Sequence, residues 1–328
     1  MDSKDRLYWV DIAKCLGIFL MILGHGPLFA CNPSLRQFIY CFHMPLFFCI
    51  SGFLYAKISF KDTLKRDYKR LLIPYLVLNL LAVFIYGIIE YLKGDLNSFH
   101  PVLMRIYSFL LGLGYAIGEF KPLLTATWFI IALFFIRLIV SICYKYIWVI
   151  TCCGIFIVLF LVKNKIDILP PIDSALLALP FFVIGFKSKK LIYKIKKCHF
   201  LVALFVTLSV NWLNGRVDID LTDFGNNILL FYVGGLSGTI MIFAFAKILD
   251  AFRTESIIRF ITIYSNGTLL VVAYNIIAIY TICKIAKYFV GDVNSFVGFV
   301  LGVLIFLMFY PAILFCTKYC PIVIGLKK

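Results

Sequence analysis

The chain consists of long apolar runs separated by short polar loops. The runs are continuous rather than alternating, and most measure about 17–22 residues, the length that crosses a bilayer as an α-helix. Continuous runs exclude the alternating strands of a membrane β-barrel. The sequence therefore predicts an all-α, polytopic integral membrane helical bundle. We expect its apolar spans near 8–27, 38–56, 71–92, 101–117, 127–143, 146–162, 172–186, 199–213, 226–246, 262–283 and 296–316.

The segment 101–117 is the weakest of these spans, because it carries Arg105 and three glycines within 111–118. We interpret it as a partial or re-entrant segment that lies against the bundle, where protein or water can satisfy its backbone. This leaves about ten transmembrane helices. No soluble domain interrupts them, so we treat 1–328 as a single transmembrane domain. The pairs Gly234–Gly238 and Gly298–Gly302 have the spacing of helix-packing glycines.

The composition agrees with a membrane protein. Hydrophobic residues make up 63% of the chain and charged residues 15%, with a mean hydropathy of +1.00. A soluble domain is about half apolar and a quarter charged. The apolar region at the N-terminus is interrupted by charges and lacks a clear cleavage site, so we do not expect a cleavable signal peptide. We interpret the 11 cysteines, mostly within apolar spans, as small buried hydrophobic residues, and we predict no metal site.

The net charge of +16 is concentrated in two short loops. The first contains Lys57, Lys61, Lys65, Arg66, Lys69 and Arg70, and the second contains Lys187, Lys189, Lys190, Lys194, Lys196 and Lys197. The positive-inside rule places both loops, and with them both termini, in the cytoplasm. The charge therefore reflects topology, and we expect no nucleic-acid partner. The segment 59–72 suits a short interfacial amphipathic helix, and anchoring on anionic lipid and binding of an anionic cosubstrate remain open alternatives for it.

Ionisable residues inside the first span are the strongest candidates for chemistry. Asp11, Lys14 and His25 interrupt this apolar run, and the spacing puts Lys14 and His25 on one helical face, about 16 Å apart along the axis. Charges in a bilayer usually pair, face a cavity or take part in chemistry. A neutral imidazole is the usual general base near neutral pH, so His25 is the leading candidate. Asp11 and Lys14 also suit an ion pair.

The second span carries His43 beside Pro45, followed by Ser51. We expect the proline to kink this helix and to open room for a site. His43 suits either substrate binding or plain helix packing, whereas Ser51 has no obvious neighbouring base and is interpreted as a packing residue. Other embedded polar residues include Trp128, Arg137 and Asn275. Arg137 can reach the cytoplasmic surface or hold a phosphate, while tryptophan is common at membrane boundaries in any case.

Several motifs together resemble the membrane acyltransferase-3 family. The first span, with Lys14, ten intervening residues and His25, is similar to that family's first-helix motif. The run Phe42-His-Met-Pro-Leu-Phe-Phe-Cys-Ile-Ser-Gly-Phe53 resembles its second-helix signature, especially in the fucose 4-O-acetylase-like, polysaccharide O-acetyltransferase branch. Weaker similarities lie in the segments 69–75, 127–134 and 179–185, so that the resemblance extends over most of the chain.

The resemblance implies an enzyme that moves an acetyl or other acyl group from acyl-CoA to a hydroxyl of a cell-envelope sugar or polysaccharide. It implies His25 as catalytic base with Lys14 as basic partner, and we add Asp11 to this catalytic set. Lys69, Arg70, Arg66 and Arg137 are the expected acyl-CoA-binding residues, and His43, Trp128 and Asn275 the expected acceptor-binding residues. The implied location is the bacterial cytoplasmic membrane, with the lipid bilayer, acetyl-CoA and a glycan or lipid-linked sugar as partners. A homodimer is also consistent with the sequence.

One position departs from the family pattern. Related chains often carry a late-span histidine where this chain has Asn275, which can donate a hydrogen bond but cannot act as a base. Lys14, Asn275 and Tyr232 remain alternatives as the donor to an oxyanion. A transporter or flippase for an envelope glycan intermediate is the main alternative function, and it would need no acyl-CoA. A scaffold subunit of a polysaccharide-synthesis complex would not need His25.

Overall fold

The computed structural model describes residues 6–94, 98–166, 168–291 and 293–326. Within these ranges the chain is helical apart from its connections and two isolated β-bridges. Among the described residues, eight helical stretches are long and apolar enough to cross a membrane, fewer than the about ten predicted. They make the chain a multi-pass membrane bundle, as predicted. We predicted a cytoplasmic location for both chain ends, and the end residues 1–5 and 327–328 lie outside the described ranges.

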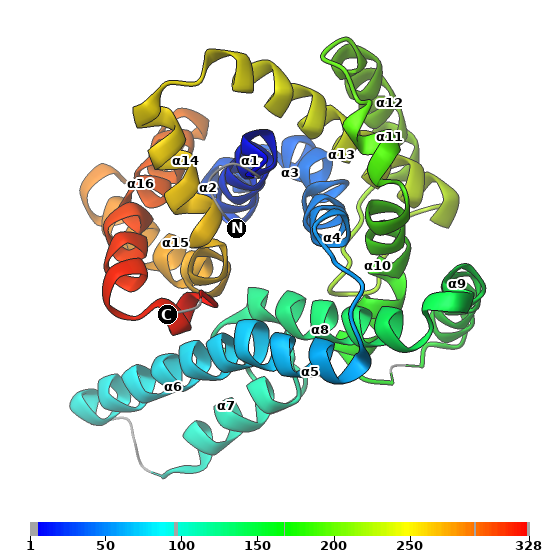
Figure 1. Cartoon of the computed structure of the whole chain (residues 1–328). Helices are drawn as coiled ribbons and strands as arrows, with labels where there is room; N and C mark the ends of the chain where they lie inside the picture. Colours follow the sequence, from blue (N-terminus) through cyan, green and yellow to red (C-terminus); the bar gives the residue numbers. More distant parts are fainter. Residues whose placement is uncertain (1–5, 95–97, 167, 292, 327–328) are drawn as a thin grey trace.

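Figure 1 shows the helices arranged around a central region. Those that surround it are α1 (Tyr8–His25), α4 (His43–Phe53), α8 (Trp128–Ile142) and α15 (Thr268–Val290). The remaining helices are α2 (Pro27–Ala30), α3 (Pro33–Tyr40), α5 (Phe60–Asp67), α6 (Ile73–Lys93), α7 (His100–Leu110), α9 (Ile147–Asn164), α10 (Pro170–Lys187), α11 (Lys189–Tyr193), α12 (His199–Asn214), α13 (Ile228–Leu249), α14 (Glu255–Asn266) and α16 (Ser295–Tyr319). Short turns of other helix types include η2 (Tyr68–Leu72), η3 (Thr125–Thr127) and η6 (Pro321–Ile324).

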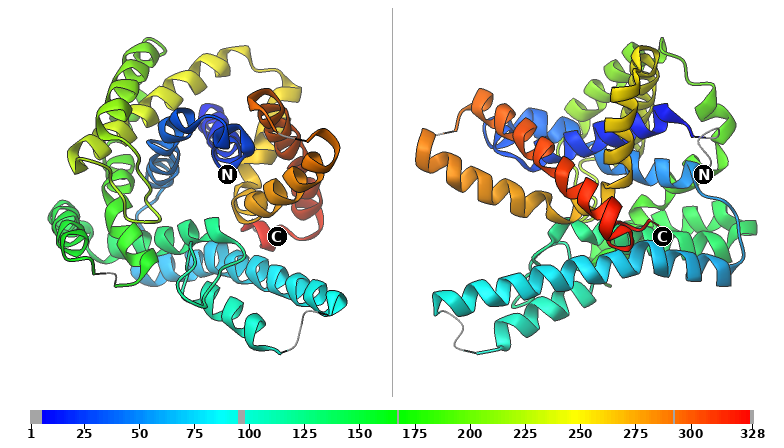
Figure 2. Two further views of the ribbon diagram at one scale, coloured as in Figure 1. Left: turned by 180° about the vertical axis from the view of Figure 1, so that it is seen from behind. Right: turned by 60° about the vertical axis from the view of Figure 1, so that its left-hand side comes forward.

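The bundle has two distinct ends. In the right-hand view of Figure 2, the start of α1, the turn η6 and the connection from α4 to α5 lie toward one end, which we call the terminal end. The end of α6 and the start of α16 lie toward the other end, which we call the distal end. Because α1 starts at the terminal end and its 18 residues rise about 27 Å, His25 lies toward the distal end.

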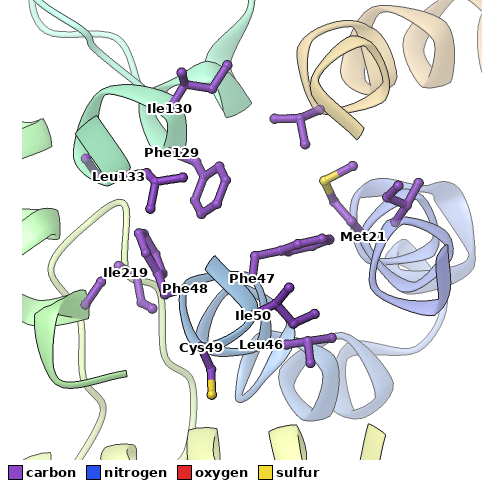
Figure 3. Packing of buried hydrophobic residues seen from close by; sticks show 14 of the residues in the cluster. Met21, Leu46, Phe47, Phe48, Cys49, Ile50, Phe129, Ile130, Leu133 and Ile219 are labelled. Carbon is purple, nitrogen blue, oxygen red and sulfur yellow. The ribbon is translucent and has the colours of Figure 1, made fainter. Parts of the chain in front are cut away.

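Helices α4 and α10 meet backbone to backbone. A methyl group added to Gly52 would lie 2.0 Å from the carbonyl oxygen of Phe182, and one added to Gly185 would lie 2.2 Å from that of Cys49. Only glycine permits this approach, which brings α4 into the core. Its side chains Phe47 and Phe48 then pack among residues such as Met21, Phe129 and Ile219 from three other segments (Figure 3).

The two predicted glycine pairs do serve helix packing. On α13, added methyl groups at Gly234 and Gly238 would meet Cys41 and Phe42 at 2.6 and 2.2 Å. On α16, an added methyl at Gly298 would lie 2.6 Å from the backbone nitrogen of Leu28. These contacts bring α13 and α16 against the segment that follows α1, so they support the position of the His25 end of that helix.

The predicted span 38–56 is not one kinked helix. The helix breaks at Cys41–Phe42, and Pro45 lies in the first turn of α4 instead of at a kink within a longer helix. The reason is local, because proline cannot donate to the carbonyl four residues earlier and its ring collides with that group, here that of Cys41. The prediction of a kink at Pro45 was therefore wrong in detail.

Three other boundaries differ from prediction. A short helix, α5, lies in the predicted segment 59–72, but it is not separate from the next span, because α5, η2 and α6 form one helical stretch, Phe60–Lys93. The π-helical turn η2 ends two residues before Pro74, which cannot make the usual bond to residue 70. The span predicted at 262–283 is interrupted, since α14 ends at Asn266 and α15 continues to Val290. Ile313 occupies the space beside Gly267 at this junction, where an added methyl would meet it at 2.5 Å.

The weakest predicted span corresponds to a short helix. Helix α7 has 11 residues and is about 16 Å long, too short to cross a bilayer of about 30 Å. It packs along α6 and is followed by a turn rich in glycine. Helices α4 and α12 are also shorter than a full crossing, with 11 and 16 residues.

Candidate active site

A cavity of about 80 Å³ lies toward the distal end, between the helices that surround the centre of the bundle. Five separate parts of the chain line it: α1, the α3–α4 segment, the start of α8 with η3, the loop between α12 and α13, and α15. The lining residues with polar groups or large rings are His25, Tyr40, His43, Thr125, Trp128, Asp218 and Asp220. The cavity thus brings together residues that are up to 255 positions apart in the sequence, from Met21 to Ile276.

His25 is the last residue of α1, and its ring is held by Tyr40. The helix stops because Gly26 is extended and Pro27 begins the next helix. The hydroxyl of Tyr40 lies 3.1 Å from Nδ1 of His25, and an Arg36 guanidinium nitrogen donates to the same hydroxyl at 3.4 Å. When Nδ1 donates to this hydroxyl oxygen, the lone pair of the ring is on Nε2, which is the form that a general base requires.

His43 occupies the first position of α4, directly after the helix break. Its Nδ1 lies 3.0 Å from the carbonyl oxygen of Ile39, and because a carbonyl only accepts hydrogen bonds, Nδ1 donates. The lone pair of neutral His43 is therefore on Nε2. The ring centres of His25 and His43 are 6.4 Å apart, and Tyr40 lies against both rings. The structure thus brings two imidazoles with base chemistry to one cavity.

The loop between α12 and α13 contributes two carboxyl groups. Backbone hydrogen bonds of 2.7 and 2.8 Å join Asp218 and Asp223, and the alternate residues Val217 and Ile219 are buried. Burial raises the pKa of Asp218, although Arg216 opposes this effect. Burial and the nearby Asp218 raise the pKa of Asp220 to about 8. At neutral pH the Asp220 carboxyl group therefore carries a proton and can donate a hydrogen bond as well as accept one.

Asp11 and Lys14 lie elsewhere, at the contact between α1 and α14. Asp11 pairs with Arg6 at 2.5 Å and accepts a hydrogen bond from the hydroxyl of Ser265. Lys14 donates to the same hydroxyl at 3.4 Å. The ion pair of Asp11 is therefore with Arg6 rather than with Lys14, and neither Asp11 nor Lys14 lines the cavity that contains His25.

The predicted acceptor-binding residues differ in their placement. His43 and Trp128 line the cavity, and Trp128 packs against Phe48 and Phe129. Asn275 is fully buried and donates to the carbonyl oxygen of Val272, but it is not among the lining residues. The hydroxyl of Tyr232, one of the alternatives for an oxyanion donor, donates to the carbonyl oxygen of Leu177 between α10 and α13.

The predicted acyl-CoA-binding residues separate into two groups. Arg66 and Arg137 both pair with the fully buried Asp67, at 3.0 and 2.8 Å, and therefore tie α5 to α8. Lys69 and Arg70 are exposed on the π-helical turn η2. This turn lies near the start of the 60–93 helix, while His25 lies toward the distal end.

Sequence reasoning missed Tyr40 and the two carboxyl groups of the α12–α13 loop. A weak signal existed for each. Tyr40 precedes His43 by three residues, and the run Val217-Asp-Ile-Asp220 alternates apolar and acidic positions, a pattern typical of an extended segment with two different faces. Neither pattern indicates that these side chains share a cavity with His25, because that depends on the packing of distant helices.

Comparison with known protein families identifies the family of the chain. The family model described as an acyltransferase domain, that of the acyltransferase-3 family, matches residues 7–324. No curated protein and no solved structure shows significant similarity to the chain. The match includes the first span with its histidine, the α3–α4 segment and the π-helical turn. The chain therefore belongs to the acyltransferase-3 family, whose membership implies transfer of an acyl group by a membrane protein.

Proposed function

We propose that the chain is an O-acyltransferase of the bacterial cytoplasmic membrane that transfers an acetyl or related acyl group from acyl-CoA to a hydroxyl of a cell-envelope sugar or polysaccharide. The observation that carries this proposal is the position of His25. Its ring lines a cavity together with His43, and Tyr40 contacts its Nδ1. With Nδ1 donating to Tyr40, a hydroxyl that enters this cavity meets a base whose lone pair, on Nε2, faces away from Tyr40.

The chemistry needs one proton carrier. His25 accepts the proton of the acceptor hydroxyl as its oxygen attacks the thioester carbonyl carbon. The tetrahedral intermediate then collapses, the carbon–sulfur bond breaks, and the protonated His25 returns the proton to the departing thiolate. The cavity is small and mostly apolar, with walls such as Met21, Phe47 and Phe129. Such walls limit water, which would otherwise hydrolyse the thioester.

The two substrates are expected at opposite ends of the bundle. Lys69 and Arg70 are exposed near the terminal end, and clustered cationic side chains attract the phosphates of acyl-CoA. The positive-inside rule makes this end cytoplasmic. His25 and its cavity lie toward the distal end, where an envelope acceptor would approach. Lys14, about 16 Å along α1 from His25, would act on the donor side, through its contact with Ser265.

A label-transfer assay tests the proposal. Purified protein in lipid nanodiscs is incubated with radiolabelled acetyl-CoA and a panel of methyl hexopyranosides, and labelled glycoside is measured. The wild-type protein should produce it, and His25→Ala should not. His199→Ala is a matched control, because His199 is exposed and bonds only to its own helix start. Transfer that survives in His25→Ala would overturn the role of this residue, and glycan movement across sealed vesicles without acyl-CoA would support the transporter alternative.

A further inference from the structure

Asp220 lies in the wall of the cavity that contains His25, on a loop whose backbone is held in place. Its loop is closed by the backbone bridge between Asp218 and Asp223, and Ile219 is buried beside it with an exposed fraction of 3%. The hydroxyl of Ser174 on α10 donates to the backbone carbonyl of Asp220 at 3.4 Å. The backbone at Asp220 is thus held both by its own loop and by α10.

Room for the carboxyl group comes from a glycine in a different connection. Gly114 follows α7, and a methyl group added there would lie 2.2 Å from Oδ1 of Asp220. Any larger residue would have to displace the carboxyl group. The backbone of Gly114 has no need for a positive φ, so space for Asp220 is the contact that explains this glycine.

One oxygen of this carboxyl group lacks a protein partner. Among the described residues, Oδ1 of Asp220 is buried and has no hydrogen-bond partner. This oxygen lies against Gly114, so a ligand in the cavity would bond to the other oxygen of the carboxyl group, since Asp220 lines the cavity. Trp128 and Phe129 line the same cavity and offer apolar surfaces. A carboxyl group next to aromatic rings suits a molecule with hydroxyls on one edge and C–H groups on its face.

We propose that Asp220 positions the acceptor by binding a hydroxyl that neighbours the one presented to His25, so that the acceptor must carry two adjacent hydroxyls. This proposal rests on the proposed function. A cavity of about 80 Å³ admits the reacting hydroxyl and its neighbours, while the remainder of a larger glycan stays outside. A protonated carboxyl group can bind a neutral hydroxyl both as donor and as acceptor.

The test measures acceptor and donor kinetics separately, in the full-length protein in nanodiscs. The acceptor is the methyl hexopyranoside that the wild type acylates fastest, together with its analogue that lacks the hydroxyl adjacent to the acylated position. Asp220→Leu should raise the acceptor KM at least ~10-fold, because a buried partner is lost, and should leave the KM for acetyl-CoA within about twofold. Asp220→Asn keeps both hydrogen-bonding functions and should stay within about threefold of the wild type. Glu119→Gln, at an exposed carboxylate paired with His100, is the matched control and should not change either KM.

The deoxy analogue keeps the proposal testable if Asp220→Leu does not fold. The wild type and Asp220→Asn should both use this analogue at least ~10-fold less efficiently than the parent glycoside, since the missing hydroxyl leaves the carboxyl group unpaired. Equal use of both glycosides by the wild type, or an unchanged acceptor KM in Asp220→Leu, would overturn the role of Asp220 while acyl transfer itself stands. Absence of transfer from acetyl-CoA to every glycoside would instead overturn the proposed function, and this proposal with it.

Discussion

Replacing Tyr40 with phenylalanine removes a single oxygen from the candidate active site. In the wild type this oxygen accepts from Arg36 at 3.4 Å and lies 3.1 Å from Nδ1 of His25. Tyr40 has an exposed fraction of 9%, and its ring packs against His43. Phenylalanine keeps this ring packing, so the substitution isolates the hydroxyl contact.

The expected effect follows from the hydrogen bond that is lost. Without the hydroxyl of Tyr40, Nδ1 of His25 has no other hydrogen-bond partner among the described residues. Leaving a buried donor unsatisfied costs about 1–3 kcal/mol, and the contact matters most when the ring carries the transferred proton. At 1.36 kcal/mol for each tenfold change in rate, kcat should fall about 5- to 150-fold. The KM for acetyl-CoA should change little, because its expected binding residues lie near the other end of the bundle.

The assay is steady-state acyl transfer with both substrates varied, combined with ¹⁵N-NMR of the histidine ring nitrogens to follow which nitrogen of His25 carries the hydrogen. Tyr280→Phe is the matched control, because Tyr280 is 69% exposed on α15. A kcat within twofold of the wild type would refute the reasoning that Tyr40 orients His25. An equal loss of kcat and of acetyl-CoA affinity would also refute it, since that result indicates a general disturbance of the fold.

Three further outcomes are expected. Gly52→Ala should lower the free energy of unfolding by at least ~1–3 kcal/mol, measured by thermal unfolding in detergent, because its methyl group would lie 2.0 Å from the carbonyl oxygen of Phe182. Asp220→Asn should flatten the pH dependence of stability. The folded wild type keeps the proton of the Asp220 carboxyl group up to about pH 8, whereas the unfolded chain loses it near pH 3.8, so the stability of the wild type falls as pH rises between these values. The melting temperature of the variant relative to that of the wild type should therefore be higher at pH 9 than at pH 4. Neutralising Lys69 and Arg70 together to glutamine should raise the KM for acetyl-CoA more than that for the acceptor, measured in the label-transfer assay.

Each of these outcomes has a control and a contradicting result. Gly87→Ala should be neutral, since an added methyl there meets nothing closer than 3.9 Å, and a similar loss of stability in both glycine variants would contradict the close α4–α10 contact. An unchanged pH slope in Asp220→Asn would show that Asp220 does not hold a proton at neutral pH. Replacing Lys284 and Lys287 of α15 with glutamine should leave the KM for acetyl-CoA unchanged, and an equal effect of both double variants would indicate a general loss of charge rather than binding at Lys69 and Arg70.

The sequence alone determined the class of the protein and the leading residue of its site. Continuous apolar runs of membrane length specify helices in lipid because every backbone group must be satisfied within its own segment. His25 stood out because placing an ionisable side chain in such an apolar segment costs free energy. His43 and Trp128 were also identified as candidates, and the structure places both in the cavity with His25. These inferences needed no knowledge of which helices touch.

The tertiary structure decided which candidates share a cavity and which only hold helices together. Asp11 and Lys14 have the same local signal as His25, yet α14 contacts them through Ser265 at another depth of the bundle. Arg66 has the same charge as its exposed neighbour Arg70, yet the buried Asp67 pairs with it.

Tyr40, Asp218 and Asp220 carry little signal in the sequence, because their role depends on loops and helices that meet only after folding. Hydrophobic periodicity indicates whether a residue faces lipid or protein, but it does not indicate which distant segment of the chain lies opposite that residue. That information depends on close contacts between helices, such as the glycine contacts of α4 with α10 and of α13 with the α3–α4 segment. The cavity, and with it the chemistry proposed for His25, therefore exists only in the folded bundle.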